Sequence, residues 1–440
     1  MKKILCAALC LCVIFALCSC AGLDAIKNTQ IPPMPTREAV AVPDEPALDS
    51  TPAPEQDGGD DENVPSADGP GADLGDRVII YTKKTQEDYG GPDGSIILLF
   101  SYVTPKVRID ERPKAAEKIN EQLNLLEEAY ISGTGNAGGR NHLLESATDN
   151  YNYIHDTGAN LNTLFTSART VKGMRADGSV VSFRFWTSVY SGGAGGSYGY
   201  YGINFDAQTG EKLTLDDLSS DPVALRQTLV DGVIDSARRE SALYGQVYWN
   251  DADAESALAA IVREGSWYFA PDGIVFFPAY GELKPENEGL TMYTVPYFAL
   301  VGVMDERFFP VKRDGSGSFE IVRVGEVTDG TVASIDRLVV SDGEEMYLKV
   351  KGTIYDLTIS SFYYVDQAEG DERFYETDRH WYASYMSDCA LQICAVVPNG
   401  MPDLMISYTD QNYVQHRLFL SESGVNGGIT LVDDTIKAVG

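Results

Sequence analysis

The feature that most limits the fold is a segment, residues 21–76, that cannot contribute to a folded core. It contains no Phe, Trp or Tyr and is rich in Pro, Asp, Glu, Ala and Gly. Between Glu38 and Asp76 it carries twelve acidic residues and no Lys or Arg. Such a composition buries too little apolar surface to offset the conformational entropy lost on folding. We therefore expect a disordered, acidic, Pro-rich tether over residues 21–76, and a fold built from residue 77 onward.

The first twenty residues have the pattern of an export signal. Lys2 and Lys3 precede an apolar run, Ile4 to Leu17, that is too short to span a bilayer as a helix. The run is followed by Ser19 and Cys20, and a small residue before a cysteine resembles the lipobox of bacterial lipoproteins. The resemblance implies that Cys20 carries diacylglycerol and becomes the mature N-terminus. The alternative is an ordinary cleaved secretion signal with a coincidental cysteine.

Charge and hydropathy limit the partners of the mature chain. After Cys20 no run of about 18 apolar residues remains, so we expect no second membrane pass. The formal net charge is −31, which repels the phosphates of nucleic acids and anionic lipid headgroups. We therefore expect an extracytoplasmic protein of the cell membrane that contacts the bilayer through its N-terminal lipid, and that does not bind nucleic acid.

Residues 77–312 combine helix and strand patterns. Pro113 suits the first position of a helix, and apolar residues follow at spacings of three and four, which places them on one face. These residues are Ala116, Ile119, Leu123, Leu126 and Tyr130. A second such pattern follows Pro222, and Arg169 to Asp206 reads as strands separated by short turns. The pattern predicts an α+β domain with mixed helix and mainly antiparallel sheet.

The amino-acid pattern changes after a Gly-Ser segment, residues 315–318. Short runs rich in Val, Ile, Tyr and Thr alternate with turn dipeptides such as Asp342-Gly343. We therefore expect residues 319–440 to form a separate accessory domain that is mostly β, a sandwich or small barrel. Within it, the segment from Asp371 to Tyr385 is expected to form a short helix.

Two ordered motifs within residues 78–312 resemble the extracytoplasmic domain of the sigma-V anti-sigma factors. The first is the glycine run after Tyr190 together with Asn204 to Leu218, and the second is Trp267 to Pro278 followed by Val295 to Phe298. The same domain occurs beside the catalytic domain of some peptidoglycan deacetylases. In the anti-sigma relatives, the resemblance implies a receptor domain that binds a secreted lysozyme.

The chain also departs from these relatives. It lacks their transmembrane helix and cytoplasmic sigma-binding segment, it carries no deacetylase domain, and Gly195 stands where the family often has histidine. The resemblance therefore implies a binding or accessory module of the envelope. Its expected partner is an envelope protein, a lysozyme-like protein or peptidoglycan.

Sequence motifs give little support for catalysis. The four histidines lack the spacing of zinc ligands, and no nucleophile elbow, phosphate loop or Ser-x-x-Lys motif occurs. Asp206 to Lys212 fits a hairpin turn better than a calcium loop, because the ligand positions of an EF-hand are not met. We expect no cofactor, no metal and no enzymatic activity. A structural or assembly lipoprotein and an uncharacterised cell-wall hydrolase are the alternatives.

The candidate binding residues lie on a predicted hairpin around the glycine run. Alternation along a strand places Val181, Phe183 and Phe185 on one face and their neighbours on the other. The second face gathers Arg184, Trp186, Tyr190, Tyr198 and Tyr200. Aromatic rings with a polar group suit protein hot spots and can stack on sugars. The alternative is that this face lies buried under the helix that begins at Pro113.

Overall fold

The computed structural model describes residues 76–133, 139–159, 164–192, 196–244, 252–283, 291–310, 313, 318–322, 335–339, 344–364, 374–387, 390–395, 404–412, 414–423 and 428–433. The chain divides into two compact units, Met1–Ala67 and Asp68–Gly440, and all the described residues belong to the second. The predicted lipid site Cys20 and nearly all of the tether therefore lie outside the described residues.

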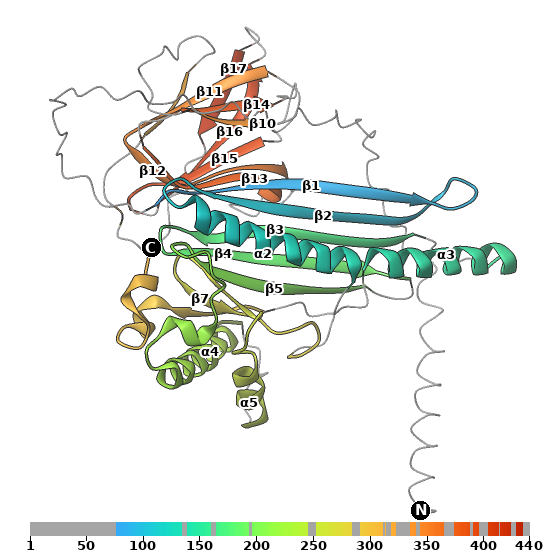
Figure 1. Ribbon diagram of the computed structural model, residues 1–440, viewed down its shortest axis with the longest axis horizontal. Helices are drawn as coiled ribbons and strands as arrows, with labels where there is room; N and C mark the ends of the chain where they lie inside the picture. The colour runs from blue at the N-terminus through green and yellow to red at the C-terminus, as the bar shows by residue number, and fades with distance from the viewer. Residues whose placement is uncertain are drawn as a thin grey trace, which may run out of the picture. The chain divides into compact units, whose positions relative to one another are not determined.

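A ten-stranded sheet forms the centre of the second unit (Figure 1). Its strand order is β17-β16-β15-β12-β13-β1-β2-β3-β4-β5. Neighbouring strands are antiparallel except β2 and β3, which pair in parallel through Leu98–Tyr102 and Phe165–Arg169. The strands from the first half of the chain are β1 (Val78–Gly90), β2 (Ile96–Ile109), β3 (Phe165–Ala176), β4 (Val180–Tyr190) and β5 (Ser197–Asp206).

Two helices connect the parallel strands, and the first of them runs along the sheet in Figure 1. They are α2 (Pro113–Ser132) and α3 (Arg140–Thr157). The predicted apolar face of α2 is confirmed, since Ala116, Ile119 and Leu123 are buried in one core with Phe183 and Phe185. The polar sequence of α3 hides its helical period, because Leu143, Ala147 and Tyr151 are its only buried residues.

A second core forms after β5. Helix α4 (Pro222–Tyr244) buries the apolar residues at its predicted spacing, from Leu225 to Ala237, against a three-stranded antiparallel sheet. That sheet, here called the small sheet, consists of β6 (Trp267–Phe269), β7 (Gly273–Phe276) and β8 (Tyr293–Pro296). The short elements η1 (Leu215–Leu218), α5 (Ala252–Ala260), η3 (Tyr297–Leu300) and η4 (Glu306–Phe308) complete this region.

The C-terminal part is mostly β, as the sequence predicts. A four-stranded sheet of order β10-β14-β11-β9 packs on part of the ten-stranded sheet around a shared core that includes Val350, Leu391 and Trp381. The α+β fold class is therefore confirmed. The strands are β9 (Ser318–Val322), β10 (Ile335–Val339), β11 (Glu344–Lys351), β12 (Thr353–Tyr364), β13 (Phe374–Ser387), β14 (Ala390–Ala395), β15 (Leu404–Thr409), β16 (Gln415–Ser423) and β17 (Gly428–Asp433).

Strand β13 joins this part to the first half of the chain and corrects one prediction. The helix expected over Asp371 to Tyr385 is wrong, because Phe374–Ser387 is a strand between β12 and β1. The backbone of this charged segment pairs with strands that are distant in the sequence, and a local pattern does not reveal such pairing. Residues Ile79–Tyr81 of β1 pair with Trp381–Ala383, so the ten-stranded sheet contains strands from both predicted domains.

Candidate binding surface

The candidate residues lie on one face of the sheet formed by β3, β4 and β5. Register places Trp186 between Thr170 and Tyr200, and Ser188 between Ala168 and Tyr198. Tyr190 lies opposite Thr166. We call the face defined by these residues and Arg184 the open face. All of them are half-buried, whereas Val171, Phe183 and Phe185 on the opposite face are buried.

The open face does not lie under α2. Helix α2 packs on the opposite face, where Phe183 and Phe185 share its core. The alternative interpretation, in which the Pro113 helix covers Trp186 and the tyrosines, is therefore wrong. The alternation of buried and half-buried side chains along β4 follows from a strand that has one face in the core and the other partly exposed.

The small sheet covers one end of the open face. The guanidinium carbon of Arg184 lies 4.9 Å from the ring centre of Tyr200 and 5.7 Å from that of Tyr268. An Nη of Arg184 lies 3.4 Å from Sδ of Met292, at hydrogen-bonding distance. The rings of Tyr200 and Phe277 meet edge to face with centroids 5.8 Å apart. Arg184 and Tyr200 therefore act as the contact layer between the two sheets.

Close backbone approach fixes the small sheet in this position. The amide of Phe269 donates to Oγ of Ser182 at 3.0 Å, and the amide of Gly202 donates to the carbonyl of Gly265 at 2.8 Å. A Cβ at Gly202 would lie 1.9 Å from the carbonyl oxygen of Trp267, so only glycine allows this approach. These contacts of Ser182 and Gly202 thus determine which part of the open face the small sheet covers.

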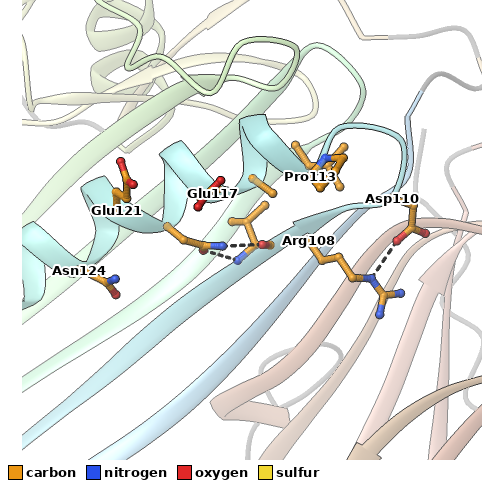
Figure 2. A pocket seen from close by; sticks show the side chains of 10 residues that line it. Arg108, Asp110, Pro113, Glu117, Glu121 and Asn124 are labelled. Carbon is orange, nitrogen blue, oxygen red and sulfur yellow. Dashed lines mark hydrogen bonds and ion pairs between the residues drawn. The ribbon is translucent and has the colours of Figure 1, made fainter. Parts of the chain in front are cut away.

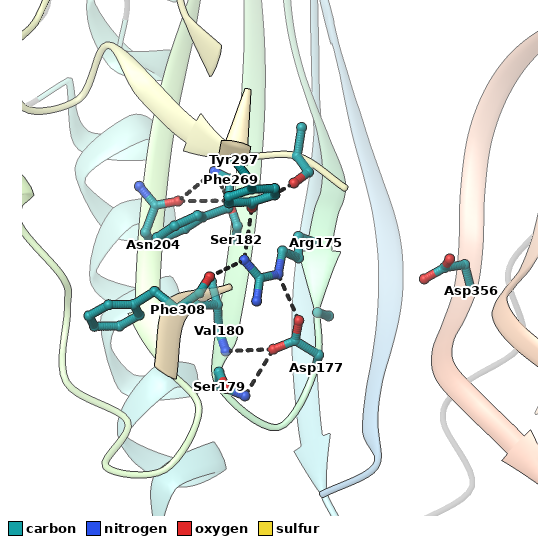
Figure 3. Close-up of polar contacts among 12 residues, drawn as sticks. Arg175, Asp177, Ser179, Val180, Ser182, Asn204, Phe269, Tyr297, Phe308 and Asp356 are labelled. Atoms are coloured by element: carbon teal, nitrogen blue, oxygen red, sulfur yellow. Dashed lines mark hydrogen bonds and ion pairs between the residues drawn. The ribbon is translucent and has the colours of Figure 1, made fainter. Parts of the chain in front are cut away.

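A buried arginine reinforces the same junction (Figure 3). Nε of Arg175 donates to Asp177 at 2.7 Å, and its Nη1 donates to the hydroxyl of Tyr297 at 2.8 Å and the carbonyl of Phe308 at 2.6 Å. Burial raises the pKa of Tyr297 to about 12. Since Arg175 is 6 % exposed and lies on β3, the network joins β3 to η3 and η4 without exposing an ionic group on the open face.

The other end of the open face remains half-exposed and gains one residue that the sequence analysis missed. The ring of Tyr280, which follows β7, lies 4.4 Å from that of Tyr198. Its hydroxyl donates to the carbonyl of Gly196 at 3.4 Å. The sequence feature that could have indicated Tyr280 is its position two residues after the Trp267 to Pro278 motif. Of the five predicted residues, Trp186, Tyr190 and Tyr198 thus belong to this end, together with Tyr280.

Small side chains, three of which carry a hydroxyl group, surround these rings. Thr166, Ala168 and Thr170 are the β3 residues of this part of the face, and Ser188 is the β4 residue between Trp186 and Tyr190. Each is half-buried. Lys172, the next β3 residue of the face, pairs with Glu376 at 3.4 Å. The surface therefore offers aromatic rings and hydroxyl groups, with its cations engaged by neighbouring side chains.

A separate hollow of about 590 Å³ lies between β2 and α2 (Figure 2). Asn120 spans it, since its side chain accepts from the amide of Val107 and donates to the carbonyl of Val107, both at 2.8 Å. Strand β2 pairs with β3 only over a short stretch. Beyond that stretch, at Val107, the side chain of Asn120 makes the hydrogen bonds that a neighbouring strand would make. Glu117 and Glu121 line the hollow, but no group of three metal-binding side chains occurs in the described part of the chain.

The histidines lie apart from the open face. His142 and His155 are exposed on α3, His380 is hydrogen-bonded to Ser361 at 2.7 Å, and His416 stacks on Tyr408. The turn after β5 is a hairpin turn, as expected, with the amide of Gly210 donating to the carbonyl of Asp206. Among the helices that the structure describes, none is both long and apolar enough to cross a membrane.

Comparison with protein-family models and with curated proteins gives no match. Among solved structures, the chain is similar to a DUF3298 family member from Bacteroides fragilis, with 16% identity and a TM-score of 0.40 over 52% of this chain and 94% of that one. It is also similar to a DUF3298 family protein from Pseudomonas aeruginosa, with 15% identity and a TM-score of 0.34 over 52% of this chain and 96% of that one.

Proposed function

We propose that this chain is a lipid-anchored, extracytoplasmic protein of the cell envelope that binds a partner through the open face. The observation that supports this most is the exposed end of that face. Trp186, Tyr190 and Tyr198 project from a sheet whose other face is a closed core, and Tyr280 from another sheet joins them. Rings that are only half-buried leave apolar area available to a ligand.

The proposed anchor rests on the sequence. The signal-like residues 1–20 end in Ser19-Cys20, and the acidic tether over residues 21–76 would hold the folded part away from anionic headgroups. A flexible chain of that length spans on the order of 40 Å root-mean-square. A binding module on such a tether would search the volume next to the membrane while it stays attached.

The partner class follows from the resemblance together with the surface. The sequence resembles a domain shared by sigma-V anti-sigma factors and some peptidoglycan deacetylases, which points to an envelope protein, a lysozyme-like protein or the cell-wall glycan. The aromatic rings suit each of these. A structural or assembly lipoprotein would not need the open face, and a hydrolase would need a set of reacting groups near it.

Retention assays test this proposal. We would prepare the mature chain with Cys20→Ser, which removes the thiol that the lipid needs, and measure its retention by isolated cell-wall sacculi and by immobilised envelope proteins. The variants are Trp186→Ala and Tyr198→Ala. Tyr153→Ala is the matched control, because Tyr153 is a 58 % exposed aromatic residue on α3.

The proposal predicts that at least one fraction retains the chain and that both open-face variants weaken retention tenfold or more, with the control unchanged. Equal retention of all four proteins, or no retention by either fraction, would contradict a binding role for this face.

A further inference from the structure

We infer that the ligand of the open face is a neutral glycan, a chain of pyranose sugars bound along the exposed end of β3, β4 and β5. The inference rests on the proposed binding role of this face and specifies its ligand. The observation that carries it is the alternation of aromatic rings and small hydroxyl-bearing side chains on one sheet surface.

The rings are spaced for consecutive flat ligand units. Trp186 and Tyr190 lie four residues apart on β4, and Tyr198 lies on β5 opposite Ser188, midway between them along the strand direction. Since a strand rises about 3.4 Å per residue, the rings follow one another at steps of about 7 Å along the sheet. Pyranose rings present apolar C–H faces that pack on aromatic rings, and a chain of them presents these faces repeatedly.

The side chains between the aromatic rings can both donate and accept hydrogen bonds. The hydroxyls of Thr166, Thr170 and Ser188 each provide one donor and two acceptor lone pairs. Sugar hydroxyls also donate and accept, so the two sets are complementary. Beside Leu99 of β2, which pairs with Thr166, the β3 residues here are small, whereas the hot spots of protein interfaces are well-packed pockets that exclude water. The lining therefore favours a glycan over a protein partner.

Charge excludes the polyanionic glycans. The chain carries a formal net charge of −31, which repels an acidic polymer. The cations of the open face have partners, since Lys172 pairs with Glu376 and the guanidinium of Arg184 lies against Tyr200 and Tyr268. Among the residues of this face that the structure describes, an anionic polymer would thus meet no cluster of unengaged positive charge. A neutral chain meets no such repulsion.

The test uses chitohexaose and cellohexaose as neutral probes and polygalacturonate as the anionic probe. Binding to the mature Cys20→Ser chain is measured by calorimetry and by tryptophan fluorescence. Trp186 is half-buried whereas Trp267 and Trp381 are each 1 % exposed, so a ligand on the face changes the Trp186 emission most among the described tryptophans.

We expect at least one neutral hexasaccharide to bind and polygalacturonate not to bind. Trp186→Ala and Tyr198→Ala should each weaken binding at least tenfold, Trp186→Phe should retain most of the affinity because a ring remains, and Tyr153→Ala should bind as the unsubstituted chain does. Melting temperatures of all variants establish that each is folded.

Two outcomes would overturn the inference, and they differ in what they say of the proposed function. If neither hexasaccharide binds while an envelope protein binds in a manner that Trp186→Ala abolishes, the face binds a protein and the glycan assignment is wrong. If no probe and no envelope fraction responds to the open-face variants, the glycan assignment and the binding role both fail.

Discussion

The rings of Tyr198 and Tyr280 lie 4.4 Å apart, centroid to centroid, at an interplanar angle of 56°. Tyr198 belongs to β5 of the ten-stranded sheet and Tyr280 follows β7 of the small sheet. The exposed aromatic surface is therefore assembled from two sheets. Its geometry depends on the buried contacts that hold the small sheet against β4 and β5.

Asp177→Asn should destabilise the fold strongly. The change removes the carboxylate that Nε of Arg175 contacts at 2.7 Å and leaves a buried guanidinium without its counter-charge. Breaking one partner of a buried ion pair costs about 3 to 5 kcal/mol. Chemical denaturation measures the free energy of unfolding, with Asp156→Asn as the control because the side chain of Asp156 is 81 % exposed. Equal unfolding free energies for the two variants would contradict the role of this network.

Stability should fall as the pH rises above about 10. Burial raises the pKa of Tyr297 to about 12 from an ordinary value of 10.0. Between these values the unfolded chain has lost the phenolic proton and the folded chain has kept it, so the unfolded state gains relative stability. A shift of this size corresponds to roughly 2 to 3 kcal/mol by pH 12. Tyr382, whose pKa burial also raises, acts in the same direction.

The measurement is thermal unfolding from pH 8 to pH 11 for the unsubstituted chain and Tyr297→Phe. The variant should unfold at a lower temperature at pH 8, because the hydroxyl that accepts from Arg175 and donates to Ala270 is gone. Its melting temperature should then fall less steeply with pH. A slope at least as steep in the variant would show that Tyr297 does not keep its proton in the folded state.

Cys20→Ser should release the protein from membranes. The thiol of Cys20 is the attachment point in the proposed anchor, and serine cannot form the thioether. Fractionation and labelling with a fatty-acid analogue measure the effect in the producing cell. Cys18→Ser is the matched control and should still be labelled. Membrane partition and label uptake by the Cys20 variant would rule out the proposed lipid site.

Residues 319–440 should fold when expressed alone. Among the described residues, the cluster around Trp381 takes one buried residue, Ile79, from the first half of the chain, with the partly buried Tyr81 packed against it. We expect a cooperative unfolding transition at a lower temperature than in the full chain, because β13 loses its pairing with β1. A fragment without cooperative unfolding would show that the predicted boundary near residue 315 does not separate two domains.

Local periodicity in the sequence predicts those helices and strands that have one buried face and one exposed face. The spacing after Pro113 predicts α2, and alternation along β4 separates Phe183 and Phe185 from Trp186 correctly. Helix α3 could not be predicted in this way because its buried stripe is short, and β13 was predicted as a helix because its charged residues conceal the strand period.

The packing of one sheet on another could not be predicted from either sheet alone. Local alternation places Arg184 and Trp186 on the same face, yet the small sheet covers Arg184 and leaves the end near Tyr198 half-exposed. That difference arises from long-range contacts, such as the approach of Gly202 to Trp267. For the same reason the sequence did not reveal Tyr280 as a member of the surface.

The binding role of the open face is tested most sharply by comparing affinity and stability for Trp186→Ala in one set of samples. Retention by cell-wall sacculi and binding of chitohexaose give the affinity, and calorimetry gives the melting temperature. If Trp186 binds the ligand, its replacement should cost about 2 kcal/mol in binding free energy, some thirtyfold in affinity, with the melting temperature nearly unchanged. A stability loss of about 3 to 5 kcal/mol, as expected for a core tryptophan, or unchanged binding in a variant of unchanged stability, would contradict this binding role.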